Sequence, residues 1–284
     1  MSAVTTLTDV TNQIQKFWSP LFMKELRNTM LLGSLVNREY DGEIKQGGDT
    51  VYVSQINAPT GELRTVGTDA DSFGTEALST SRISIQASKR AVGAFEFQDL
   101  AVLQSQLESE ESEIRQALLF AVNNKINTYL YSLVAPSTSA PDHELASVTD
   151  LNSAQLSAIR VLAGEAKWDH LKAWYGLCSP AHYMDIADDT TMSSSLYGAE
   201  DRPILSGQLG LPRYGFNIFE DTSRSGDYSI FFHPDFMHLV TQKEVSFQIS
   251  SLHSQKKFGY VISADIIFGA ALGISGSVKH IRAQ

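Results

Sequence analysis

Residues 99–134 have the sequence pattern of one long helix. No Gly or Pro interrupts this segment, and Pro136 follows its end. At a rise of 1.5 Å per residue the helix would be about 54 Å long. Because helices of globular domains mostly run about 8–20 residues, we expect a spine that crosses a flat or extended molecule. Its apolar residues recur every three or four positions, as in a helix with one buried stripe: Leu100, Leu103, Leu107, Ile114, Leu118, Val122, Ile126, Tyr129 and Leu133.

The apolar stripe has one gap, at residues 110–111, in a stretch rich in carboxylates. The acidic residues of this stretch are Glu108, Glu110, Glu111 and Glu113. They form either a solvated face or a surface that contacts basic groups on a neighbouring subunit. The apolar spacing is not a sustained heptad with charged flanks, which argues against a coiled coil.

Composition excludes several classes of protein. The chain has 284 residues, of which 43% are hydrophobic and 19% charged, as in one or two globular domains. Its net charge of −10 opposes generic binding to a phosphate backbone, although a protein that encloses nucleic acid without gripping it still fits. The single Cys178 excludes an intrachain disulfide framework and suits the core. The longest apolar run, 266–274, is far shorter than the roughly 20 residues that cross a bilayer, so no membrane partner is expected.

An amphipathic helix is expected from Asn12 to Met30, and it places Phe17, Trp18 and Phe22 on one face. Pro20 would kink or restart this helix. So apolar a terminal segment must be buried, either on the core of its own chain or on a neighbour.

A β-hairpin is expected next. One strand contains Val51 and Val53, and the other alternates around Ile83 and Ile85. The connection is rich in Gly, Ser, Thr and Asp, and an isolated two-stranded hairpin is marginal in water. Its tip, roughly 61–80, is therefore either disordered or laid across another molecule. The few apolar residues of the tip are Leu63, Val66, Phe73 and Leu78.

The rest of the chain mixes short helices and strands without a regular βαβ alternation, which predicts an α+β fold. We expect a helix capped by Asp150 or Asn152 and ended by Gly164. A strand follows at 174–178, and Ser179-Pro180 opens the next helix. Further strands are expected around 216–219, 228–232, 245–249, 260–274 and 277–281.

Motifs for catalysis, metals and cofactors are absent from the sequence. The Gly cluster at 207–215 lacks the spacing of a phosphate-binding loop. His233 and His238 lie five residues apart across a Pro, which disfavours a metal site. Asp265, inside an apolar strand, is the one suspicious carboxylate, and pairing with an Arg or a backbone amide is the favoured role over catalysis. We therefore expect neither an enzyme nor a cofactor.

The order of these parts resembles the major capsid protein family of tailed bacteriophages, whose fold encapsulin compartments share. The resemblance covers nearly the whole chain and is carried by four segments. These are FWSPLFMKEL, LVNREYDGEIKQGGDTVYV, GQLGLPRYGFNIFED and the tail beginning KEVSFQISSLHSQKKFGYVISADIIFG.

The resemblance implies an N-arm (1–48), an extended loop (49–95), a peripheral domain with the spine helix (96–149 and 243–268) and an axial domain (150–242 and 269–284). It implies pentamers and hexamers of this chain in an icosahedral shell around double-stranded DNA. The expected contacts between subunits are Phe17, Trp18, Phe22, Leu63, Arg64, Val66, Phe73 and the four glutamates. An encapsulin-like shell around cargo protein and a soluble α+β enzyme remain the alternatives.

The implied setting is a virion, with assembly in the cytoplasm of a host bacterium. Because the arm begins almost at Met1, we expect a separate scaffolding protein and no proteolytic trimming. Portal and decoration proteins are the other implied partners. Some members of the family link subunits by an isopeptide bond from a Lys of the extended loop. Residues 50–88 contain no Lys, so we expect no such cross-link.

Overall fold

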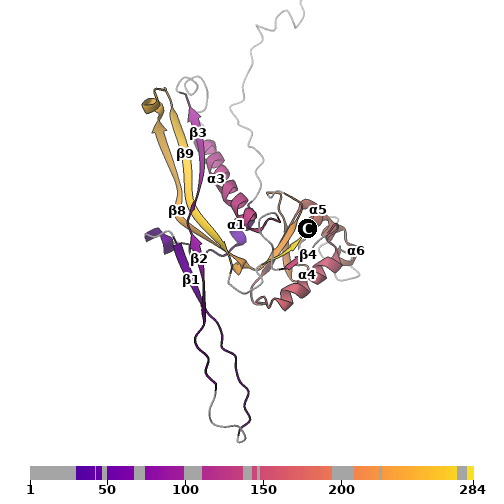
Figure 1. Cartoon of the computed structure of the whole chain (residues 1–284). Coiled ribbons are helices and arrows are strands. Elements are labelled where there is room, and N and C mark those ends of the chain that lie inside the picture. The colour runs from indigo at the N-terminus through magenta and orange to yellow at the C-terminus, as the bar shows by residue number, and fades with distance from the viewer. Residues whose placement is uncertain are drawn as a thin grey trace, which may run out of the picture.

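The computed structural model describes residues 30–41, 43–46, 50–66, 74–98, 111–136, 143–145, 148–193, 208–223, 226–273 and 280–284. In this part of the chain a first lobe of long strands and one helix adjoins a second, α/β lobe, and a hairpin projects from the first lobe (Figure 1). The arrangement is α+β, as predicted. The helix expected from Asn12, and residues 99–110 of the expected spine, lie outside the described residues.

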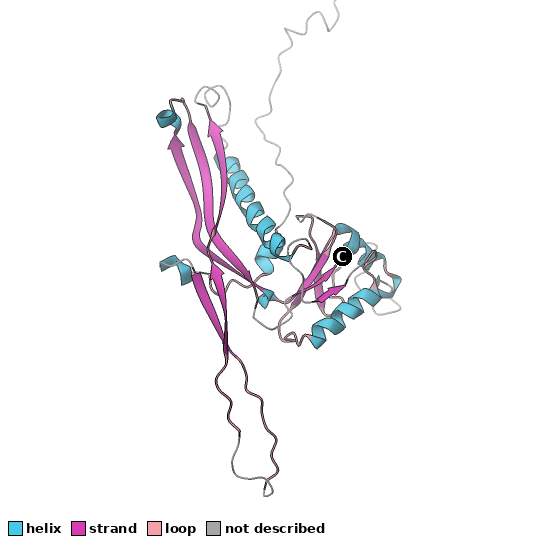
Figure 2. Cartoon of the chain, in the orientation of Figure 1, coloured by secondary structure: helices cyan, strands magenta, loops and turns pink. Residues whose placement is uncertain are grey.

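The first lobe is an antiparallel sheet with helix α3 (Glu111–Val134) along one face (Figure 2). The sheet has the order β3 (Lys89–Phe97), β9 (Tyr260–Leu272), β8 (Met237–Ser251), and 3-10 helix η6 (Leu252–Gln255) joins β8 to β9. Alternate residues of β9 face the helix, because side chains alternate along a strand. The core between helix and sheet includes Leu118, Val122, Ile126, Leu130, Ala264, Ile266 and Phe268.

The second lobe contains a mixed sheet in the order β4 (His143–Leu145), β10 (His280–Ala283), β7 (Ser229–Phe232), β5 (Trp174–Cys178), β6 (Phe216–Glu220). Helices α4 (Ser153–Glu165), α5 (Pro180–Asp188) and α6 (Thr190–Ser193) belong to this lobe. Strand β7 is buried throughout because both of its faces are covered. Ile230 and Phe232 join the core that includes α3, whereas Phe231 joins the core of the second lobe.

The expected helix starts of the second lobe are confirmed. The Asn152 side chain accepts hydrogen bonds from the backbone N–H groups of Ala154 (3.0 Å) and Gln155 (3.4 Å), as an N-cap does. Ser179 caps α5, and Pro180 occupies its first turn. Gly164, expected to end α4, lies inside its last turn, since the helix continues to Glu165.

Polar contacts also join the two lobes. Asp221, after β6, accepts hydrogen bonds from the Tyr131 hydroxyl of α3 and from the backbone N–H of Ser223 (2.8 Å). Asn127 of α3 donates to the Ser223 hydroxyl at 2.7 Å. The short 3-10 helix η5 (Pro234–Phe236) carries the chain from β7 to β8. The helix, the loop after β6 and η5 therefore fix the junction of the lobes.

The hairpin consists of β1 (Thr50–Ile56) and β2 (Thr80–Gln86), paired antiparallel from Thr50↔Gln86 to Ile56↔Thr80. It follows the short elements α1 (Leu32–Leu35) and η2 (Glu43–Gln46). Residues 89–95, which the resemblance assigns to the extended loop (49–95), form most of strand β3 in the sheet of the first lobe. Strand β3 pairs antiparallel with β9 along its whole length, from Lys89↔Phe268 to Phe97↔Tyr260, and this pairing makes it part of the sheet.

Candidate surfaces for subunit contact

The base of the hairpin is anchored on the first lobe by a small apolar cluster. Val51 and Ile85 pack with Val240 of β8 and Ile44 of η2 in this cluster. The chain between β2 and β3 crosses β9 at Gly269, where an added Cβ would lie 2.1 Å from the carbonyl oxygen of Gln86. Only a residue without a side chain allows this approach. The hairpin therefore leaves the lobe from a fixed base.

Beyond the ladder, residues 57–66 and 74–79 form a segment that we call the hairpin extension. Its two branches are held together by few contacts. Asn57 N–H donates to the Ser79 carbonyl at 3.0 Å, and Thr60 N–H donates to the Glu76 carboxylate at 3.1 Å. The extension projects away from both lobes (Figure 1). Such a segment buries almost nothing within its own subunit.

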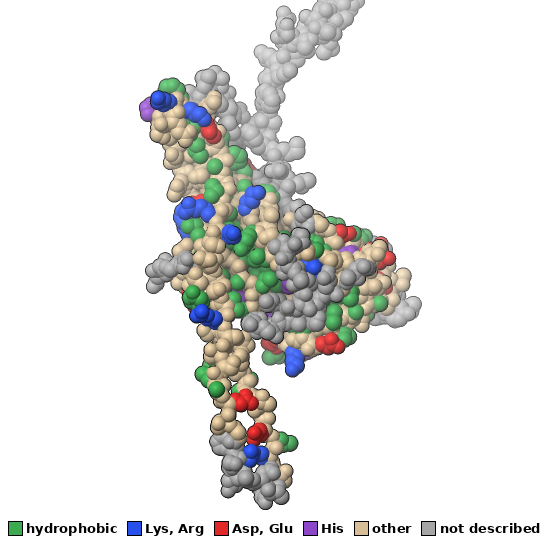
Figure 3. Space-filling view, in the orientation of Figure 1, with side chains coloured by type: hydrophobic (Ala, Val, Ile, Leu, Met, Phe, Trp, Pro, Cys, Tyr) green, Lys and Arg blue, Asp and Glu red, His purple; other side chains and the backbone are tan. Residues whose placement is uncertain are grey.

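Apolar side chains of the extension face solvent. Leu63 and Val66 are fully exposed, at 102% and 100% of the reference area, and Leu78 is 75% exposed. Figure 3 shows green apolar atoms, red carboxylates and blue basic atoms on this projection. Extended apolar patches on a surface mark interaction sites, so a segment that exposes three large apolar side chains is a candidate contact. Arg64 forms an exposed ion pair with Glu62 at 3.0 Å, so its charge is partly offset.

The other expected contact residues are only partly described. Glu113 is half-buried on α3, and Glu111 begins that helix, although its side chain is not described. The remaining expected contact residues, Phe17, Trp18, Phe22, Phe73, Glu108 and Glu110, lie outside the described residues.

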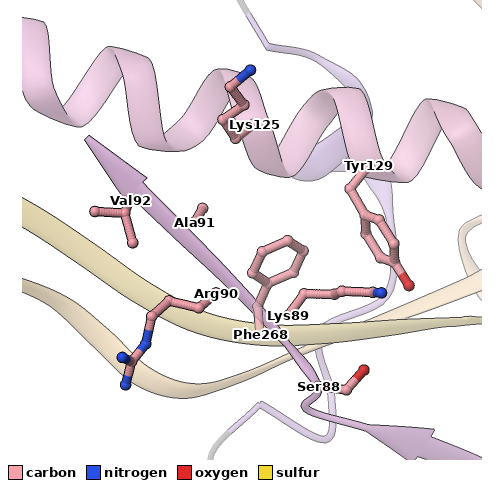
Figure 4. Close-up of a pocket in the computed structure, with 8 residues that line it drawn as sticks. All are labelled: Ser88, Lys89, Arg90, Ala91, Val92, Lys125, Tyr129 and Phe268. Atoms are coloured by element: carbon pink, nitrogen blue, oxygen red, sulfur yellow. The ribbon is translucent and has the colours of Figure 1, made fainter. Parts of the chain in front are cut away.

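A shallow cavity of about 460 Å³ lies between α3 and β3. In Figure 4, Tyr129 points from α3 toward Lys89, Arg90 points the opposite way, and the Lys125 ammonium points away from the strand. The Lys89 ammonium lies 5.6 Å from the centre of the Tyr129 ring, within the range of a cation–π contact. The cavity thus has an apolar floor, with basic side chains from both elements around it. Its lining residues are Ser88, Lys89, Arg90, Ala91, Val92, Lys125, Tyr129 and Phe268.

Sequence reasoning missed this cavity. It is formed by two segments, 88–92 and 125–129, that come together where β3 packs against α3. The sequence offered two separate indications, which are the pair Lys89-Arg90 and the basic residue Lys125 on the predicted helix. Strand β3 also lies at one edge of the described sheet, so half of its backbone groups face away from β9.

Asp265, the suspicious carboxylate, is paired. The Lys243 ammonium lies 3.1 Å from Oδ1, the Ser246 hydroxyl donates to Oδ1 at 2.5 Å, and Arg90 lies 3.6 Å from Oδ2. The hydrogen bonds from Ser246 and Lys243 hold the pKa of Asp265 below its ordinary value. An ionised carboxylate with three donors around it is a structural ion pair and not a poised general acid. The cation is mainly Lys243, whereas the sequence suggested an Arg or a backbone amide.

Metal-binding clusters and membrane-spanning helices are both absent from the described residues. They contain no group of three or more His, Cys, Asp or Glu side chains placed to hold a metal ion. No helix among them is both long and apolar enough to cross a membrane.

The sequence matches no family model, and it matches no curated protein. Solved structures do match. The chain aligns with a structure titled Mycobacterium phage Che8 at 16% identity, covering 95% of this chain and 97% of that one, with a TM-score of 0.77. It aligns with the capsid of cyanophage P-SCSP1u at 11% identity, covering 98% and 94%, with a TM-score of 0.76.

A third match, the capsid of Ralstonia phage GP4, is 11% identical, covers 99% of this chain and 98% of that one, and has a TM-score of 0.68. These alignments span both lobes and the hairpin, so no additional domain is needed to account for the match. At such low identity they compare folds and not sequences. The chain therefore has the fold of the phage major capsid proteins.

Proposed function

We propose that this chain is the major capsid protein of a tailed bacteriophage, which assembles as pentamers and hexamers into an icosahedral shell around double-stranded DNA. The observation that carries the proposal is the hairpin extension. It exposes Leu63, Val66 and Leu78 on a segment that has no core of its own. A second subunit that covers these side chains would give the extension its structural role. The likeness to phage capsid chains over nearly the whole length supports the same conclusion.

The division into parts follows from this proposal. We assign 1–48 to the N-arm and 49–88 to the extended loop, with β3 moved to the peripheral domain because it pairs with β9. The first lobe, including all of β8 and β9, is the peripheral domain. The second lobe, near the centre of a capsomer, is the axial domain.

The α3–β3 cavity fits as the place where a neighbour's extension binds. Its lining includes Lys89 and Lys125, whereas the extension carries Glu62 and Glu76 beside exposed apolar residues. An extended segment can also add by backbone hydrogen bonds to the side of β3 that faces away from β9 in the described sheet. Charge and the position of β3 at the sheet edge therefore favour the same pairing.

A charge-reversal pair tests this contact. K89E/K125E and E62K/E76K, each alone, should reduce assembly because like charges would meet, and the combined variant should recover it. E165K, which reverses an exposed charge at the end of α4 and lies outside both surfaces, is the control. Failure of the combined variant to recover assembly would exclude this cavity as the binding place while leaving the shell proposal intact.

The other partners are those that a shell requires. We propose a separate scaffolding protein, a portal protein and a decoration protein as partners, and assembly in the cytoplasm of a host bacterium before the shell becomes part of the virion. The net charge of −10 would limit adhesion of packaged DNA to the wall, consistent with enclosure without sequence-specific binding. No catalytic step is assigned to the chain.

The decisive experiment is negative-stain microscopy of the protein expressed with its neighbouring structural genes, followed by analysis of what the particles enclose. Closed shells that protect double-stranded DNA are the expected result. Shells that enclose an enzyme would indicate an encapsulin-like compartment. A small oligomer in all conditions, judged by size-exclusion chromatography, would contradict a shell and favour a soluble enzyme.

A further inference from the structure

The segment 36–41, which we call the arm root, is fastened to the start of β8. Asn37 N–H donates to the Met237 carbonyl at 3.1 Å, and Leu239 N–H donates to the Asn37 carbonyl at 3.0 Å. The Asp41 carboxylate accepts a hydrogen bond from Thr241 N–H at 2.7 Å. The hairpin begins nine residues after Asp41, at Thr50. Tyr40 of the arm root also packs against the apolar cluster at the base of the hairpin, so the two attachments adjoin.

His238 lies at the centre of this attachment. It pairs with Asn37 in an isolated β-bridge, and its ring packs edge-on against Tyr40 with 5.4 Å between centroids. The side chain is 4% exposed. Among the described residues, neither ring nitrogen of His238 has a hydrogen-bond partner. A charge on this imidazole would thus be buried without a direct partner, which is costly.

The charged groups around His238 do not offset that cost. Asp235 and Glu39 favour its protonation and Lys172 opposes it. Asp235 is already engaged, because it pairs with Lys172 and accepts a hydrogen bond from the Asn37 amide at 2.9 Å. Burial is the largest effect, and it lowers the pKa of His238 below its ordinary value.

A second imidazole, His233, lies at the other end of η5. It packs against Trp168 at 5.3 Å between ring centroids, and its Nδ1 is buried without a partner among the described residues. Asp235 and Asp169 favour a charge on it, whereas Lys172 and His238 oppose one. Burial again lowers the pKa. Both imidazoles that flank η5 are therefore held neutral at pH 7.

We propose that His238 is a proton-operated latch, which holds the arm root on β8 while it is neutral and releases it when it is protonated. Release exposes the imidazole to water, where its pKa returns to about 6.5. The released state therefore binds a proton that the latched state rejects. As pH falls below about 6.5, the ratio of released to latched subunits rises by up to about tenfold per pH unit, until the pKa of the latched state is reached. Above pH 7 the latch is insensitive to pH.

In a shell, the latch would let mild acid free the arm root from β8 while the hairpin base stays anchored on the first lobe. This consequence rests on the proposed function, whereas the latch itself is a property of one subunit. Its test therefore uses the unassembled full-length chain. A result that contradicts the latch would therefore leave the shell proposal untouched, and a result that contradicts the shell would leave the latch untouched.

Hydrogen–deuterium exchange, corrected for the intrinsic effect of pH on exchange rates, measures the latch directly. Peptides that cover 36–41 and 237–241 should lose about tenfold in protection between about pH 7.5 and about pH 5, while peptides of α4 keep theirs. In H238F, whose ring fills the same space but cannot titrate, the loss should disappear. H253F, which replaces an exposed imidazole on η6, should behave like the wild type. Unchanged protection in the wild type, or an equal loss in H238F, would overturn the proposal.

A second measurement does not depend on whether H238F folds. The ring proton of His238 can be followed by NMR from about pH 8 to about pH 5 in the wild-type chain. Its titration midpoint should lie clearly below 6.5, the ordinary value for His. A midpoint at or above about 6.5 would mean that the buried site accepts a proton freely, and the latch would be excluded.

Discussion

The guanidinium Nη1 of Arg282 donates a hydrogen bond of 3.2 Å to the carbonyl oxygen of Val134, and so joins the last strand of the chain to the last residue of helix α3. The Arg282 side chain is 2% exposed. A cation is well placed at a helix C-terminus, where carbonyl groups lack partners within the helix and the helix dipole is negative. This contact holds the spine helix to the sheet of the second lobe.

Replacing Arg282 should therefore destabilise both lobes together. R282M keeps most of the side-chain volume but removes the donor, and we expect a loss of about 2–4 kcal/mol in the free energy of unfolding. Urea denaturation followed by circular dichroism measures it. R64M, on the exposed hairpin extension, should change the same quantity by less than about 0.5 kcal/mol. Equal effects of the two variants would contradict a structural role for the buried guanidinium.

Shortening the hairpin should separate folding from assembly. Replacing residues 58–78 by Asn-Gly closes the ladder after the Asn57–Ser79 contact with a turn suited to two-residue hairpin loops. The variant should keep the circular dichroism spectrum and solubility of the subunit, because residues 58–66 and 74–78, the described part of the removed segment, are exposed. It should form no shells under negative stain. Loss of the folded spectrum would instead show that the extension belongs to the core of its own subunit.

The crossing at Gly269 should tolerate no side chain. In G269A the new Cβ would lie 2.1 Å from the Gln86 carbonyl oxygen, and backbone must move to relieve this contact. We expect a loss of at least about 1–3 kcal/mol, measured by thermal or urea denaturation. G164A is the matched control, since nothing lies within 4 Å of the added Cβ and the position is helical. G164A should raise stability by about 0.5–1 kcal/mol.

The sequence predicted correctly those features that depend on residues close together in the chain, namely helix caps and alternating strands. The caps at Asn152 and Ser179 were predicted correctly, since a cap depends on neighbouring residues only. The hairpin strands follow the alternation of Val51, Val53, Ile83 and Ile85, and the apolar stripe of α3 was correct where the structure describes it.

The features that the sequence did not predict depend on contacts between residues far apart in the chain. Strand β3 belongs to the first sheet because it pairs with β9, about 170 residues later, and no local pattern states that pairing. The cavity beside Lys89 and the burial of Arg282 and His238 arise in the same way. Lys89, Arg282 and His238 are polar residues that a sequence pattern would place on the surface. They contribute to packing only because elements far apart in the sequence meet around them.

The ion pair at Asp265 should give a defined pH dependence. Because its folded pKa is depressed, Asp265 stabilises the fold above the unfolded value of about 3.9, and the contribution is lost as pH falls through the folded pKa. D265N should therefore cost about 1 kcal/mol at pH 7 and nothing further in strong acid, measured by urea denaturation across pH. D227N, at an exposed site, is the control. A cost of D265N that persisted unchanged below the folded pKa would show that the contribution is not electrostatic.

Assembled particles should contain no covalent links between subunits. An isopeptide bond needs an amine on the far part of the hairpin, and residues 50–88 contain no Lys. Their only basic residues are Arg64 and Arg82, whose guanidinium groups remain protonated and are poor nucleophiles. Lys89 lies against Tyr129 in the first lobe, away from the extension.

The turn between β8 and β9 offers Gln255 and no Asn as an acceptor. The single Cys178 is buried and could in any case form only one bond per subunit. Particle strength must then come from noncovalent burial of the arm and the hairpin extension. Boiling mature particles in SDS should release one band near 31.2 kDa. A ladder of multimers that resists both boiling and reductant would contradict this prediction, and mass spectrometry of the ladder would identify the linked residues.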